Sequence, residues 1–185
     1  MRITEAERDK YSKVWGLDDY AVYSPGKETV DYFFRIARPG PGQSVLDVGA
    51  GSGAGSKALK DKGLSVRAFD ITDVAWRHPD IHLDVGCVWR DLNLVDFDFV
   101  YCCDMMEHIP TEFVGLTLDR ILKTCESGKA FFSISFTEDH FGTFIGQDLH
   151  LTVKPFAWWR DMLRELGKVH EARDRMGHGV FLVGR

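Results

Sequence analysis

The chain has 185 residues, a length that predicts one domain, 1–185, able to bury a core around a central sheet. Its hydrophobic content of 44% and charged content of 28% are ordinary for a globular protein, and its net charge of −5 argues against a phosphate-binding surface over the whole molecule. The four cysteines have no C-x-x-C spacing, residues 1–10 lack a signal-peptide pattern, and no apolar run could cross a bilayer. We therefore expect a cytoplasmic protein with no membrane partner.

Two helices are predicted before the first strand. The amphipathic segment 4–15 forms the first. Ser24-Pro25 supplies an N-cap and a first-turn proline for the second, over 26–38, which Pro39-Gly40-Pro41-Gly42 ends. Because both helices precede the first strand, residues 1–40 are predicted to form an N-terminal helical cap over the site. The alternative is a solvent-facing segment without ligand contacts.

Strands and helices alternate along the rest of the chain. Apolar runs predict strands at 43–48, 64–69, 81–85, 97–103, 130–136, 168–173 and 179–183. Helical patterns predict helices at 53–61, 111–126 and 155–167. A hairpin at 175–178 joins the last two strands. This order predicts an α/β fold, a Rossmann-like, mostly parallel seven-stranded sheet with helices on both faces and an antiparallel C-terminal strand.

The stretch V-L-D-V-G-A-G-S-G-A-G at 45–55 carries the strongest functional signal. A buried strand runs there into Gly49, Gly51 and Gly53. Glycine adopts positive φ without cost and lets a ligand approach the backbone, and the N–H groups that open the next helix can hold a negatively charged group. The stretch predicts a site for a nucleotide-like cofactor. The alternative is a turn that only lets strand and helix pack closely.

Asp70 closes the second strand of this βαβ unit. An acidic residue at that position can accept hydrogen bonds from both ribose hydroxyls of an adenosine. A carboxylate there can also cap a turn, as the following Ile71-Thr72-Asp73 would allow. The spacing from the glycine loop favours the ribose role.

Four motifs together resemble class I S-adenosylmethionine (SAM)-dependent methyltransferases. They are Asp47-x-Gly49-x-Gly51-x-Gly53, Asp70, Phe97-Asp98-x-Val100 and Glu107-His108-Ile109, and the resemblance covers 43–184. It implies SAM as the cofactor. The glycine loop would lie under the methionine portion, and Asp47 would orient the loop or the amino group. Asp70 would bind the ribose, and Asp104, after the fourth strand, would also contact the cofactor near its methyl group.

The family usually places an acidic residue against the adenine after the third strand. This chain has Gly86-Cys87-Val88-Trp89 there. We therefore expect Cys87 and Val88 to bind the adenine, with the Val88 N–H and apolar packing in place of a carboxylate. Asp84 is the alternative acid.

Methyl transfer to a hydroxyl needs alignment, exclusion of water and a group that removes the proton. Asp104, His108 and His150 are the catalytic candidates. Alternatively, Asp104, Glu107, His108 and His150 bind Mg²⁺, as a similar pattern does in ubiquinone-pathway O-methyltransferases and small-RNA 2′-O-methyltransferases. We favour a site without metal, because spacing alone does not make side chains converge. His170 and His178, near the final strands, are expected on the surface.

The predicted function is SAM-dependent methyl transfer to a small-molecule acceptor, preferably at oxygen. One alternative is an NAD(P)-dependent Rossmann oxidoreductase, because Gly49-x-Gly51-x-x-Ala54 and Asp70 also satisfy the dinucleotide fingerprint. Another is a non-catalytic SAM-binding protein, because Cys87 replaces an acid. Charge and size disfavour nucleic acid as a partner, although a terminal nucleotide stays open. The segments 20–26 and 137–152 are expected to shape the acceptor pocket. The oligomeric state is not predicted.

Overall fold

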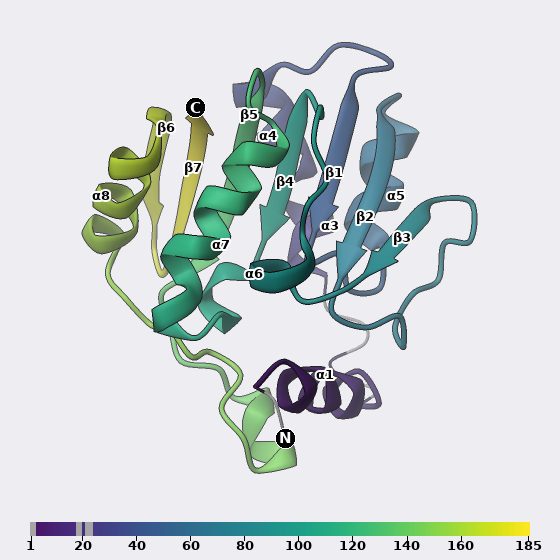
Figure 1. Cartoon of the computed structure of the whole chain (residues 1–185), viewed down its shortest axis with the longest axis vertical. Coiled ribbons are helices and arrows are strands. Elements are labelled where there is room, and N and C mark those ends of the chain that lie inside the picture. The colour runs from purple at the N-terminus through teal and green to yellow at the C-terminus, as the bar shows by residue number, and fades with distance from the viewer. Residues whose placement is uncertain (1–2, 18–19, 21–23) are drawn as a thin grey trace.

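A seven-stranded sheet forms the centre of the computed structural model, which describes residues 3–17, 20 and 24–185 (Figure 1). The strand order is β3-β2-β1-β4-β5-β7-β6. All neighbouring pairs are parallel except those that β7 makes with β5 and β6. The strands are β1 (Ser44–Val48), β2 (Ser65–Asp70), β3 (His82–Val85), β4 (Phe99–Cys103), β5 (Lys129–Ser135), β6 (Lys168–Arg175) and β7 (His178–Gly184). The predicted fold class is confirmed.

Helices cover both faces of this sheet (Figure 1). One face packs against α6 (Val88–Asp91), α7 (Thr111–Thr124) and α8 (Phe156–Leu166). The other packs against α3 (Pro25–Glu28), α4 (Val30–Ala37) and α5 (Ala54–Asp61). Strand β5 is buried on both faces of the sheet. Phe132 packs in the core beside α7 and α8, and Phe131 packs in the core beside α4 and α5. A strand buried on both faces needs apolar residues at successive positions.

The predicted second helix is divided at Thr29, which ends α3 and precedes α4. The Thr29 hydroxyl donates a hydrogen bond back to the Pro25 carbonyl at 3.1 Å and contacts Cys103 Sγ at 3.2 Å. A threonine hydroxyl that bonds the preceding turn competes with helix continuation and bends the chain. The break lets α4 lie along the sheet, while α3 lies near the carboxyl ends of the strands.

Three short helices lie where no helix is predicted from the sequence: α6 and the 3₁₀-helices η1 (Met106–His108) and η2 (Phe141–Ile145). The first helix, α1 (Ile3–Val14), lies beside η2, beyond the carboxyl ends of the parallel strands (Figure 1). Of the segment 20–26 expected to shape the acceptor pocket, residues 21–23 lie outside the described residues. In the described part of the chain, every helix is too short or too polar to cross a bilayer.

Candidate active site

Two connected pockets lie at the carboxyl ends of β1, β2 and β4. The first has a volume of about 100 Å³, and its wall includes Asp70, Val88 and Trp89. The second, of about 290 Å³, reaches toward β5 and β7. The pockets share six lining residues: Trp15, Tyr20, Gly49, Gly51, Asp104 and His108. A group passing from one pocket to the other would therefore pass Asp104 and His108.

The glycine loop after β1 borders both pockets through Gly49 and Gly51. Their φ angles are 79° and 54°, in the left-handed region that favours glycine. A Cβ on Gly49 would lie 2.5 Å from the Met105 side chain, and one on Gly51 would lie 2.6 Å from the Trp15 ring. Close approach to the backbone therefore requires glycine at both positions. Gly53, predicted as a third cofactor residue, lines neither pocket and lies against Trp76 instead.

Asp70 holds the glycine loop in place and also lines the first pocket. Its Oδ2 accepts a hydrogen bond from the Gly51 N–H at 2.8 Å, and its Oδ1 accepts one from the Thr72 N–H at 3.1 Å. Burial raises the pKa of this carboxyl, and the two backbone donors oppose that shift. Asp70 therefore caps the turn, as one interpretation of the sequence predicted, and its carboxylate also borders the first pocket.

Asp47 lies under the start of α5 rather than in the first pocket. Its Oδ2 accepts a hydrogen bond from the Ser56 hydroxyl at 2.6 Å, and it borders the second pocket. Burial raises the pKa of Asp47 to about 7, although the Ser56 hydrogen bond lowers it. The carboxyl therefore fixes the helix start against the strand that precedes the loop.

The wall after β3 differs from the expectation for the adenine. Val88 and Trp89 line the first pocket, whereas Cys87 does not. The Cys87 N–H donates to Asp91 Oδ2 at 2.8 Å, because the chain turns into α6 there. Asp84 cannot replace the missing acid, since it forms a salt bridge with Arg67 at 2.6 Å and lines neither pocket. The wall at this position is apolar.

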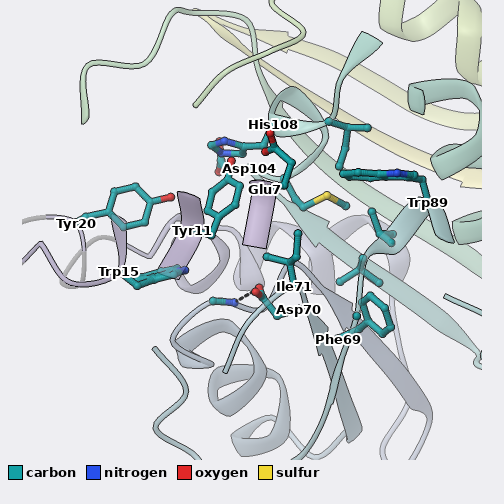
Figure 2. Close-up of a pocket in the computed structure, with 17 residues that line it drawn as sticks. Glu7, Tyr11, Trp15, Tyr20, Phe69, Asp70, Ile71, Trp89, Asp104 and His108 are labelled. Atoms are coloured by element: carbon teal, nitrogen blue, oxygen red, sulfur yellow. Dashed lines mark hydrogen bonds between the residues drawn. The ribbon is translucent and has the colours of Figure 1, made fainter. Parts of the chain in front are cut away.

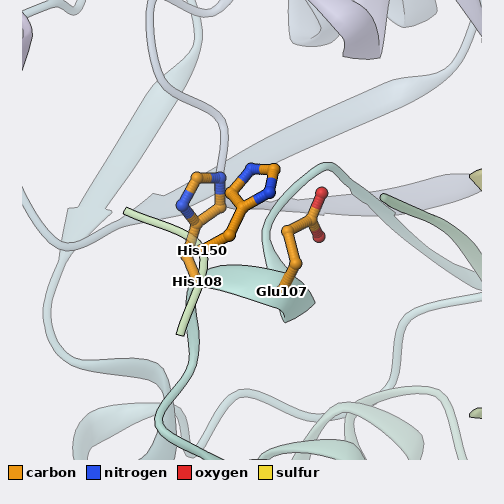
Figure 3. Close-up of side chains that lie close together, drawn as sticks. All are labelled: Glu107, His108 and His150. Atoms are coloured by element: carbon orange, nitrogen blue, oxygen red, sulfur yellow. The ribbon is translucent and has the colours of Figure 1, made fainter. Parts of the chain in front are cut away.

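Glu107, His108 and His150 form a cluster whose donor atoms lie within 4.8 Å of one another (Figure 3). Glu107 is fully buried: its Oε1 accepts the Ser135 N–H at 2.9 Å, and its Oε2 has no hydrogen-bond partner among the described residues. The Glu107 carbonyl also accepts the N–H groups of Leu151 and Thr152 at 2.8 and 2.9 Å. These bonds bring the His150 loop onto η1.

Both imidazole rings of the cluster are oriented by backbone carbonyls. His108 Nδ1 lies 3.1 Å from the Leu149 carbonyl oxygen, and His150 Nδ1 lies 2.6 Å from that of Thr137. Because a carbonyl only accepts, each Nδ1 carries the proton and each Nε2 keeps a lone pair. Burial, then the neighbouring His150, lowers the pKa of His108 to about 3, while burial and then Asp104 raise the pKa of Glu107. The cluster therefore disfavours an added proton on the His108 ring and negative charge on Glu107.

Asp104 lies next to Glu107, whose pKa it raises, and it also contacts a residue for which the sequence indicated no role in the site. Its Oδ1 lies 3.1 Å from Nε2 of His178, the first residue of β7. Asp104 has a φ of 46°, which is uncommon for a residue with a side chain. His178, expected on the surface, is partly exposed and also lines the second pocket. The antiparallel pairing of β7 with β5, which sets His178 opposite Ser135, is the feature that could have revealed it.

The sequence profile of the methyltransferase domain family matches residues 23–179. The chain belongs to this family. The predicted resemblance to class I SAM-dependent methyltransferases, with SAM as the cofactor, is thereby confirmed. The match also speaks against the NAD(P)-dependent alternative.

Curated relatives include ubiquinone biosynthesis O-methyltransferases. The protein of that name from Idiomarina loihiensis is 31% identical over 108 residues, which are 50% of this chain and 42% of the relative. The one from Coxiella burnetii is 32% identical over 107 residues, 50% of this chain and 43% of the relative. The match thus spans less than half of the length of these two relatives.

Solved methyltransferases share the fold of this chain. A TehB-like SAM-dependent methyltransferase from Corynebacterium glutamicum superposes with a TM-score of 0.67 at 17% identity, covering 98% of this chain and 99% of that one. Phosphoethanolamine N-methyltransferase 2 of Haemonchus contortus, solved with SAM, gives 0.67 at 19% identity, covering 92% and 43%. At these identities the likeness concerns the fold.

Helix α1 and the residues that follow it border the first pocket. Figure 2 shows Tyr11, Trp15 and Tyr20 on one side of the pocket, across from Phe69 and Trp89. The Tyr11 hydroxyl is buried without a hydrogen-bond partner among the described residues.

Proposed function

We propose that this methyltransferase transfers the methyl group of SAM to an oxygen atom of a small-molecule acceptor. The observation that carries the proposal is the cluster of Glu107, His108 and His150, in which His108 borders both pockets and His150 the second, with lone pairs available on both rings. A hydroxyl acceptor must lose a proton, and such a cluster provides for that loss. The second pocket, about 290 Å³, suits a small acceptor. The names of the curated relatives agree with oxygen as the target.

The cofactor residues of the proposal follow from the first pocket. Gly49 and Gly51 would contact the methionine portion, Asp70 the ribose, and Val88 with Trp89 the adenine. Asp47 would act indirectly by fixing the start of α5. Asp104 would lie beside the methyl group, because it borders both pockets. Helix α1 would be the part of the predicted 1–40 cap that covers the cofactor.

The same cluster fits a divalent cation. The unpartnered Glu107 Oε2, the two free Nε2 atoms and the low pKa of His108 are satisfied together by a positive ion. Although the sequence favours a site without metal, this donor set supports one held by Glu107, His108 and His150, without Asp104. Two imidazoles and one carboxylate suit Mn²⁺ or Zn²⁺ better than Mg²⁺, which prefers oxygen ligands. A bound cation would lower the pKa of an acceptor hydroxyl.

Metal binding can be tested apart from turnover. Isothermal titration of chelator-treated protein with Mn²⁺, Zn²⁺ and Mg²⁺ should show one site that prefers Mn²⁺ or Zn²⁺. His150→Ala should weaken that site, whereas His82→Ala, an exposed histidine on β3, should not. If none of the three ions binds, the metal is removed from the proposal and His150 remains as the base, since a pKa near 3 makes His108 a poor one.

The proposed reaction is tested by titration with SAM and NADH, followed by turnover on a panel of phenols and catechols. We expect SAM to bind, NADH not to bind, and methyl ethers to form, detected by mass spectrometry. SAM binding with no product across hydroxyl, amine and thiol acceptors would favour the non-catalytic alternative.

A reducing, cytoplasmic setting is also proposed. All four cysteines, Cys87, Cys102, Cys103 and Cys125, are buried and free. Burial raises the pKa of the Cys87 thiol to about 11, which keeps it protonated and unreactive. Fluorescent tagging of the chain in its native cells would test the location.

A further inference from the structure

A basic groove lies on the α4 face of the sheet, and it shares no lining residue with either pocket of the active site. Its volume is about 880 Å³. Tyr32, Arg35 and Arg38 line it from α4 and its C-terminal cap, and Lys129 lines it from the start of β5. The remaining charged lining residues belong to β6: His170, Glu171, Arg173, Asp174 and Arg175. Helix α8 packs on the opposite face of the β6–β7 hairpin.

The charge of the groove opposes that of the chain. Five arginine and lysine side chains and one histidine face two carboxylates, Glu171 and Asp174, in a protein whose net charge is −5. One of these carboxylates is already engaged, because Glu171 binds Arg173 at 2.5 Å. Within the described residues, Arg35, Arg38, Lys129 and Arg175 have no carboxylate partner. Several cations without counterions around one hollow attract an anionic ligand.

The ring of Tyr32 orients two of these cations. Its centroid lies 4.4 Å from the Arg35 guanidinium carbon and 4.8 Å from that of Arg175. A guanidinium stacked on an aromatic ring uses its flat face, so the N–H groups at its edge remain free to donate. The two forks are therefore restrained before any ligand arrives, which lowers the entropy cost of binding.

The groove continues toward the acceptor pocket. Arg175 and His178 are directly paired across the β6–β7 hairpin, so their side chains leave the same face of the sheet. His178 lines the second pocket of the active site, while Arg175 lines the groove. A ligand in the groove would thus have one end next to the acceptor pocket.

We propose that this groove binds the phosphate groups of a ligand, either a single strand of nucleic acid or a phosphorylated metabolite. Phosphate matches the fork of an arginine with two parallel hydrogen bonds, and a dianionic group can engage more than one guanidinium. The net charge of −5 does not reveal this basic surface, because all but two of the 28 acidic residues lie outside the lining of the groove. The binding proposal does not depend on which atom the methyltransferase methylates.

Equilibrium binding at low salt tests the groove directly. Fluorescence anisotropy with labelled decauridylate and calorimetry with inorganic pyrophosphate should both show binding to the wild-type chain. The double variant Arg35→Gln/Arg175→Gln should lose about a hundredfold in affinity. It should also reduce the slope of log K against log salt by about 2 for decauridylate, one for each lost phosphate contact.

The matched control is Arg160→Gln/Arg164→Gln, which removes the same charge from α8 on the other face. It should bind as the wild type does, and thermal melting should show that both double variants are folded. Tighter binding with increasing oligonucleotide length identifies a strand as the source of the phosphates, and equal affinity for pyrophosphate identifies a metabolite. Absence of binding to both probes, equal losses in the two double variants, or tighter binding of polyglutamate than of decauridylate would overturn the proposal.

Discussion

Two parts of the candidate active site are assembled in different ways. We call the part proposed to bind the cofactor the cofactor half, and the part proposed to bind the acceptor the acceptor half. In the cofactor half, Asp47 binds Ser56 and Asp70 binds Gly51, pairs that are 9 and 19 residues apart in the chain. In the acceptor half, Glu107 binds Ser135 at a separation of 28 residues, and Asp104 binds His178 at 74. The contacts of the cofactor half form within one βαβ unit. Those of the acceptor half form only after the later strands have joined the sheet.

This contrast predicts that substitution of Glu107, in the acceptor half, reduces turnover without affecting cofactor binding. The largest effect is expected for Glu107→Gln, which keeps an acceptor for the Ser135 N–H and removes the acidic oxygen of the cluster. We expect turnover to fall by about 10²–10⁴-fold, while affinity for SAM, measured by calorimetry, stays unchanged. Glu112→Gln, an exposed change on α7, is the control. A matching loss of SAM affinity would contradict the division into halves.

In the cofactor half, Asp47→Asn should change the pH dependence of stability. The folded-state pKa of Asp47 is raised to about 7 from a reference value of 3.8, so the native state binds the extra proton. Wild-type stability should therefore fall as pH rises from about 4 to about 7, by up to about 4 kcal/mol. The asparagine variant should lack that fall and be the more stable chain at pH 8. Parallel urea-unfolding profiles of the two proteins from pH 5 to 8 would refute this prediction.

Gly51→Ala should weaken cofactor binding through both backbone strain and contact with Trp15. Strain of this kind costs about 1–3 kcal/mol, which corresponds to an affinity loss of about 5- to 150-fold. Gly63→Ala is the matched control, because its φ is 92° but its Cβ would meet no atom within 4 Å. Equal SAM affinities for the wild type and Gly51→Ala would remove this glycine from the cofactor site.

The smallest effect is expected at the long-range pair of the acceptor half. The hydrogen bond to Asp104 raises the pKa of His178, so its stabilisation is complete below the unfolded pKa and is lost as pH rises through the folded pKa. His178→Gln should therefore reduce the melting temperature more at pH 5.5 than at pH 8.5. The partial exposure of the side chain, 39%, keeps the difference small. A larger reduction at the higher pH would show that Asp104 is not its main partner.

The same contrast explains how far the sequence could be interpreted. The strands, their order along the chain and the glycine loop follow from patterns within a few tens of residues, and these predictions agree with the fold. The role of His178 could not be foreseen, because it depends on β7 entering the sheet antiparallel to β5. The left-handed backbone at Asp104, with a φ of 46°, likewise could not be foreseen from its residue type.

Helix α1 touches both halves and so links their occupancy. Arg8 donates to the Ile71 carbonyl beside the cofactor pocket at 3.1 Å, and Lys10 donates to the Asp148 carbonyl in the acceptor loop at 3.2 Å. A ligand that stabilises the docked helix from one side also stabilises the wall of the other pocket. We expect cofactor and acceptor to raise each other's affinity by the same factor, as thermodynamic reciprocity requires. The helix would then make cofactor release slow while the acceptor is bound, and faster once the methylated product has left.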